Sequence, residues 1–119
     1  MTTAEVANKL VALCREGKHL EAVETLYDDN IVSREMPGYP NEITEGIKAV
    51  HQKSEDFFSS VAEWHGGDLS DPVIAGNHFT TKSTMDATFK DGNRVKMEEI
   101  AVYEVKDGKI IKEQFFYSM

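Results

Sequence analysis

The sequence predicts an α+β domain in which helices come first and an antiparallel sheet follows. Apolar residues recur at helical spacing through much of the first half of the 119-residue chain. Between His78 and Tyr117, long alternating runs are interrupted by Asp91-Gly92 and Asp107-Gly108, which are typical of tight hairpin turns. We therefore expect one domain, residues 1–119, that ends in a meander of long strands.

Three helices are expected before the meander. A first helix begins at Thr2 or Thr3, and a short second helix ends at Asp28-Asp29-Asn30. A third helix begins at Thr44 or Gly46. Its spacing predicts a buried stripe that contains Ile47, Val50, Phe57 or Phe58, and Val61.

Shorter strands are expected around the third helix. Residues 31–35 predict a strand, and residues 36–42 a loop, because that segment is rich in Pro, Gly and Asn. Residues 61–69 predict another strand, which carries Trp64 and His65.

Two-residue turns in the meander would fix which side chains share a face of the sheet. With turns at Asp91-Gly92 and Asp107-Gly108, Ile100 lies opposite Ser83 on one side and Phe115 on the other. The more apolar face, expected to pack on the helices, contains Phe79, Met85, Ala87, Phe89, Ile100, Val102, Ile111, Phe115 and Tyr117. The opposite face contains Thr80, Lys82, Thr84, Asp86, Thr88, Met97, Glu99 and Tyr103.

Two carboxylates, Glu98 and Glu113, fall on the predicted apolar face. Burial raises the pKa of a carboxylic acid, and a raised pKa makes the group a useful proton carrier near neutral pH. Two structural alternatives exist for Glu113. It reaches solvent if its strand lies at a sheet edge, or it changes face if a one-residue bulge occurs at Gly108.

Composition excludes several classes of partner. The formal net charge of −8 argues against nucleic acid and against anionic membrane surfaces. No apolar run approaches the ~18 residues of a membrane span, and the first residues do not resemble a signal peptide. Cys14 is the single cysteine, which suits a reducing cytoplasm, and the histidines lack metal-ligand spacing.

Several local strings, taken in order, resemble the nuclear transport factor 2-like superfamily, and within it the SnoaL-like and ketosteroid-isomerase-like group. The strings are Leu20-Glu21-Ala22-Val23, Leu26-Tyr27-Asp28-Asp29, Gly46-Ile47-Lys48-Ala49-Val50 and residues 103–110. The resemblance covers nearly the whole chain. It implies a cone-shaped, curved antiparallel sheet wrapped around the three helices, as in a cystatin-like roll.

The resemblance also implies an apolar pocket for a small hydrophobic molecule, such as a ketone or a polyketide-like compound. Members of the group act as isomerases or cyclases by acid–base chemistry that needs no cofactor and no metal. Many pair through the outer face of the sheet, so a homodimer is expected. Other members only bind or associate, and a non-catalytic module is the alternative.

The resemblance places the general base of ketosteroid isomerases at Glu35. The two positions that hold the oxyanion in those enzymes fall on Leu10 and Ile100, whose side chains donate no hydrogen bond. We therefore predict that Glu35 and Glu98 transfer protons, assisted by His65, for which a solvated rim position is the alternative. The predicted substrate-binding residues are Trp64, Glu113, Phe115, Tyr117, Phe57 and Tyr27.

Overall fold

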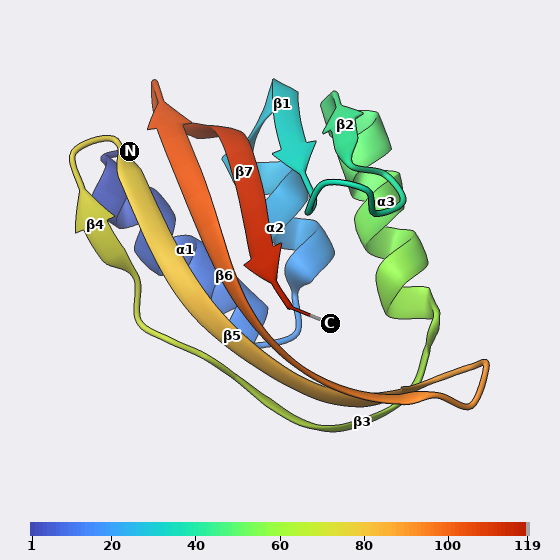
Figure 1. Ribbon diagram of the computed structural model, residues 1–119. Coiled ribbons are helices and arrows are strands. Elements are labelled where there is room, and N and C mark those ends of the chain that lie inside the picture. The colour runs from blue at the N-terminus through green and yellow to red at the C-terminus, as the bar shows by residue number, and fades with distance from the viewer. Residues whose placement is uncertain (119) are drawn as a thin grey trace.

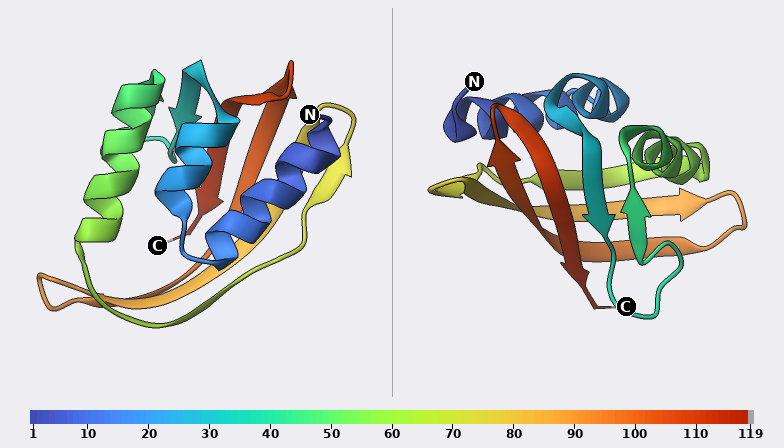
Figure 2. Two further views of the ribbon diagram at one scale, coloured as in Figure 1. Left: turned by 180° about the vertical axis from the view of Figure 1, so that it is seen from behind. Right: turned by 90° about the horizontal axis from the view of Figure 1, so that it is seen from above.

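A computed structural model describes residues 1–118 and has three helices on one side of a curved sheet (Figures 1 and 2). The helices are α1 (Thr3–Arg15), α2 (His19–Leu26) and α3 (Ile47–Ser59). The strands are β1 (Tyr27–Arg34), β2 (Ile43–Glu45), β3 (Val61–Leu69), β4 (Val73–Ala75), β5 (His78–Phe89), β6 (Arg94–Lys106) and β7 (Lys109–Tyr117). The predicted fold class is confirmed.

The strands form a mixed sheet in the order β2-β1-β7-β6-β5-β3, with β4 also paired to β5. All neighbours are antiparallel except β1 and β7, which run parallel. A strand from the first half of the chain therefore lies beside the last strand. The long strands β3, β5 and β6 bend round the ends of the helices at the bottom of Figure 1.

The first helix begins as its sequence predicts. Thr2 and Glu5 form a capping box, in which the Thr2 side chain accepts from the Glu5 amide and the Glu5 carboxylate accepts from the Thr2 amide. One face of α1 is then buried against the sheet through Val6, Ala7 and Leu10. Within residues 1–118, no helix is both long enough and apolar enough to cross a membrane.

The turn between β5 and β6 is one residue longer than predicted. The Phe89 amide donates to the Asn93 carbonyl over 2.8 Å, which leaves residues 90–92 as a three-residue loop. Gly92 ends the loop at φ 92°, a conformation that glycine adopts without steric cost. This extra residue shifts β6 by one position along β5.

A shift of one residue exchanges the two faces of β6. Glu99, Ala101 and Tyr103 face the helices, whereas Glu98 and Ile100 face outward. The Glu98 side chain is 74% exposed. The predictions that Glu98 lies inside, and Glu99 and Tyr103 outside, are therefore wrong.

After Ile111, the last strand keeps its predicted face because a second irregularity compensates for the first; before it, Ile110 is the fully buried residue, not Ile111 as predicted. The turn at Asp107-Gly108 has the expected two residues, at φ 51° and 76°. A bulge at Ile111 then shifts β7 by one position against β6. As a result, Glu113, Phe115 and Tyr117 point toward the helices, as predicted.

Candidate functional site

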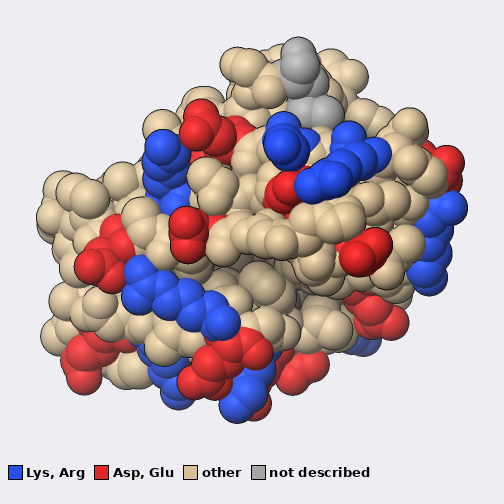
Figure 3. Space-filling model, turned by 90° about the horizontal axis from the view of Figure 1, so that it is seen from below, with Lys and Arg blue, Asp and Glu red and all other residues tan. Residues whose placement is uncertain are grey.

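The helices and the concave face of the sheet surround a pocket of about 1080 Å³. Such a volume suits a small organic ligand. The molecular surface seen from below is hollowed near its centre (Figure 3). Aromatic side chains form part of the pocket wall, and among them are Phe57, Phe58, Trp64 and Phe89.

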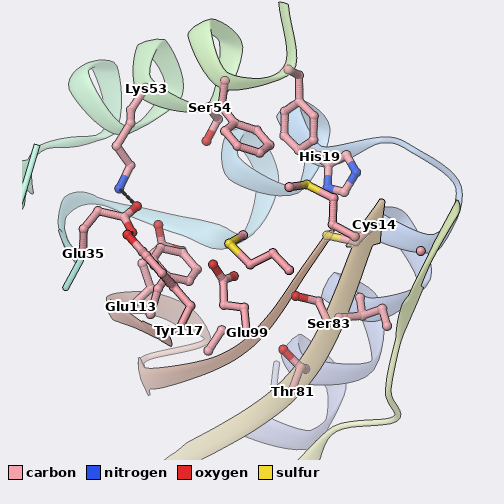
Figure 4. Close-up of a pocket in the computed structure, with 18 of the residues that line it drawn as sticks. Cys14, His19, Glu35, Lys53, Ser54, Thr81, Ser83, Glu99, Glu113 and Tyr117 are labelled. Carbon is pink, nitrogen blue, oxygen red and sulfur yellow. Dashed lines mark hydrogen bonds and ion pairs between the residues drawn. The ribbon is translucent and has the colours of Figure 1, made fainter. Parts of the chain in front are cut away.

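Glu35 follows the last residue of β1, and its side chain lines the pocket where the predicted base was expected. Its Oε1 atom lies 3.1 Å from the Lys53 ammonium, and its Oε2 atom accepts a hydrogen bond of 3.0 Å from the Tyr117 hydroxyl. Figure 4 shows Lys53 reaching from its helix toward this carboxylate. Two donors therefore fix both oxygens of Glu35.

Lys53 was not found by the sequence analysis. It projects from α3 and donates to the Ser33 hydroxyl over 2.7 Å as well as to Glu35. The helical spacing of the sequence does indicate its position, because Lys53 stands three residues after Val50 and four before Phe57. Residues at these spacings share one face of a helix, so Lys53 belongs to the buried side of α3.

Glu113 lies behind this ion pair and is only 4% exposed. It accepts hydrogen bonds from the Ser33 hydroxyl at 2.9 Å and from the Tyr27 hydroxyl. Burial raises the pKa of Glu113, against the lowering effect of these two hydrogen bonds and of the Lys53 charge. The alternative of a solvated edge position is wrong, because β7 lies between β1 and β6.

Glu99 is the third carboxylate of the pocket. Burial raises its pKa to about 7, and the negative charges of Glu35 and Glu113 act in the same direction. The positive charge of Lys53 opposes this rise. Figure 4 shows the Glu99 carboxyl group on the same side of the pocket as Glu35 and Glu113. Near neutral pH, Glu99 can therefore both give and take a proton.

The other predicted site residues divide into two groups. Those that line the pocket are Trp64, Phe57, Phe115, Tyr117, Tyr27 and Glu113. Two do not line it. His65 hydrogen-bonds to the Thr88 hydroxyl over 2.7 Å, and Glu98 pairs with Lys82 at 3.7 Å on the outer face of the sheet.

The opposite side of the pocket contains Cys14 and His19 (Figure 4). The His19 ring stacks on Phe58 with centroids 4.2 Å apart, and burial lowers its pKa, which favours neutral imidazole. Burial raises the pKa of the Cys14 thiol to about 11, which makes it a poor nucleophile. Among residues 1–118, no group of three or more His, Cys, Asp and Glu side chains is arranged to hold a metal ion.

The pocket thus combines apolar walls with a fixed carboxylate, an acid that titrates near neutral pH and a half-buried cation. Fold and site together define a class of small pocket proteins built on a curved sheet and three helices. The sequence profile of the SnoaL-like domain matches residues 1–117, and the chain belongs to the SnoaL-like domain family. No curated protein matches the chain.

Solved structures agree with this assignment. One is a Mesorhizobium loti protein that is provisionally described as a SnoaL-like polyketide cyclase and as a carbohydrate phosphatase. Its sequence is 36% identical to this chain, and the two structures superpose with a TM-score of 0.92 over 98% of this chain and 100% of the other. A cystatin-like protein from Xanthomonas campestris is 15% identical with a TM-score of 0.83, over 100% and 92% of the two chains. A ketosteroid isomerase-like fold from Catenulispora acidiphila, in complex with trimethylamine, is 15% identical with a TM-score of 0.75, over 97% and 86%.

Proposed function

We propose that the protein binds a small hydrophobic molecule in this pocket and moves a proton on it, as an isomerase or a cyclase. The substrate would be a ketone or a polyketide-like compound. Glu35 would take the proton and Glu99 would supply one, without a cofactor. The Mesorhizobium loti relative, at 36% identity, carries two provisional descriptions, SnoaL-like polyketide cyclase and carbohydrate phosphatase, and the first supports this class of reaction.

One observation carries the proposal. Glu35 and Glu99 line the same pocket but have different environments. Glu35 contacts the Lys53 ammonium, whereas the half-buried Glu99 side chain has no such ion pair with any residue that the structure describes. Burial raises the pKa of Glu99 to about 7. Two carboxylates with unlike environments are the usual arrangement for a base and an acid in one site.

Exchange of carbon-bound protons with D₂O tests the proposal without knowledge of the product. A panel of enones and β-ketoesters is incubated with the protein, and loss of the α-proton signal is followed by NMR. We expect Glu35→Gln to slow exchange by ~10²–10⁴-fold, the usual contribution of a positioned base. Glu98→Gln, which alters a neighbour of Glu99 on the outer face, is the matched control and should leave the rate unchanged.

If the Glu35→Gln variant exchanges the α-protons as fast as the wild-type protein, Glu35 is not the base. The competing proposal is a non-catalytic binding module of the same fold. It is favoured by Glu113, whose hydrogen bonds from Tyr27 and Ser33 satisfy the carboxylate within the protein. Compounds of the panel that bind, but exchange no faster than in buffer, would support that alternative.

A further inference from the structure

The Lys53 ammonium is placed to contact a ligand as well as Glu35. An ammonium carries three N–H bonds, and the contacts with Ser33 and Glu35 use two of them. The side chain lines the pocket and is 16% exposed. A third N–H bond therefore remains for an acceptor atom in the pocket.

The hydroxyl groups that contact this cluster are already engaged. Tyr27 and Ser33 donate to Glu113, and Tyr117 donates to Glu35. A hydroxyl has one hydrogen to donate, so none of these three is left to hold a substrate oxygen. Leu10, at the position where related isomerases carry a phenol, has no donor either.

The surroundings of Lys53 make it a strong partner for an anionic oxygen. Its nitrogen lies 5.4 Å from the centre of the Phe115 ring, and its positive charge opposes the rise in the pKa of Glu99 and of Glu113. A charge held partly out of solvent acts more strongly than it would in bulk water.

We propose that Lys53 Nζ binds the substrate oxygen on which negative charge develops, and that the pocket therefore selects compounds that form an enolate or a phenolate. This rests on the proposed function. When Glu35 takes a proton from the carbon next to a carbonyl, the C–H electron pair becomes a new C=C bond and the C=O π pair moves to oxygen. Lys53 holds that oxygen by a charge-assisted hydrogen bond. Return of a proton to another carbon restores the carbonyl.

The test uses 4-nitrophenol as a probe, because its visible absorption reports whether the bound molecule is ionised. In the wild-type protein the bound probe should ionise at lower pH than the free probe. Lys53→Met should raise the apparent pKa of the bound probe by about one unit or more, which is tenfold in its ionisation constant. Lys53→Arg should restore most of the effect. Lys48→Met, an exposed lysine on the same helix, is the matched control.

Other groups that line the pocket could donate instead, and the Tyr103 phenol and protonated Glu99 are among them. The proposal is overturned if Tyr103→Phe or Glu99→Gln, rather than Lys53→Met, raises the apparent pKa of the probe. It is also overturned if the wild-type protein does not lower that pKa. Lys53→Gln provides a second uncharged variant if Lys53→Met unfolds, as judged by circular dichroism.

The two proposals fail in different measurements. If Glu35→Gln abolishes exchange but Lys53→Met leaves the ionisation of the probe unchanged, the base assignment holds and the role of Lys53 falls. If no compound exchanges but the probe still ionises through Lys53, the pocket binds anionic oxygens without catalysis.

Discussion

The neighbours Glu98 and Glu99 show how far one strand position changes the environment of a carboxylate. Glu98 is exposed on the outer face and pairs with Lys82. The Glu99 side chain is half-buried in the pocket, and the charges of Glu35 and Glu113 help to raise its pKa. The two residues share a backbone segment and a side-chain type, and they differ in the face of the sheet on which they lie.

This difference predicts how stability depends on pH. The folded protein binds a proton at Glu99 more tightly than the unfolded chain does, because its pKa rises from 4.5 to about 7 on folding. The contribution of Glu99 to the free energy of unfolding therefore falls as pH rises from about 4.5 to about 7, and it is constant above that window. Glu99→Gln cannot ionise, so it should remove this fall in the free energy of unfolding. We expect it to stabilise the protein at pH 8 by on the order of 2 kcal/mol.

Urea unfolding at pH 5 and pH 8 measures this effect, with Glu98→Gln as the control. The stability gained by Glu99→Gln should be larger at pH 8 than at pH 5, and the control should show no such difference. Equal pH profiles for the two variants would contradict the burial of Glu99.

Single residues also explain which parts of the site could be predicted. Glu35 was expected at the pocket from the family resemblance, and it lines the pocket. The strand before it could be located because the loop that follows is rich in Pro, Gly and Asn. Glu99 was misplaced because loop length depends on the backbone conformation at Gly92, and Asp-Gly suits both two-residue and three-residue turns. Lys53 was missed because its partners, Ser33 and Glu35, are distant in sequence.

At the scale of elements, the close approach of β3 to β5 shapes one wall of the pocket. A Cβ atom on Gly67 would lie 2.6 Å from the Thr84 carbonyl oxygen, whereas one on Gly66 would meet no atom within 4 Å. Glycine at position 67 therefore lets the two backbones approach closely. The adjacent residues Gly66 and Gly67 consequently have different structural roles.

We expect Gly67→Ala to lower the free energy of unfolding by about 1–3 kcal/mol, because the added methyl group must displace a backbone. Gly66→Ala should change it by about 0.5 kcal/mol or less. Thermal or urea unfolding of both variants provides the measurement. A similar loss in both would show that β3 does not depend on this contact.

At the scale of the whole molecule, the outer face of the sheet carries an exposed apolar pair. Ile100 and Phe116 lie opposite each other on β6 and β7 and are 50% and 43% exposed. Lys82 and Glu98 lie beside them with opposite charges. Such a patch is self-complementary about a two-fold axis, because Lys82 of one copy can face Glu98 of the other.

We propose that two copies associate through this face, as expected from the sequence. Phe116→Glu should give a single-chain mass in light scattering, since it places a charge in the apolar patch. Val73→Glu alters a more exposed valine on β4 and should leave the dimer intact. The proposal fails if the wild-type protein already has the mass of one chain, or if both variants dissociate equally.

The pairing of β1 with β7 joins two strands that the ribosome makes at different times. Glu35 and Tyr117 are 82 positions apart, and Ser33 and Glu113 are 80 apart. A ribosome that adds about 5–20 residues per second therefore exposes β1 for roughly 4–16 s before its partner strand exists. During that time one edge of β1 is open to other chains, so protection of the growing chain matters more for yield than for the stability of the finished molecule.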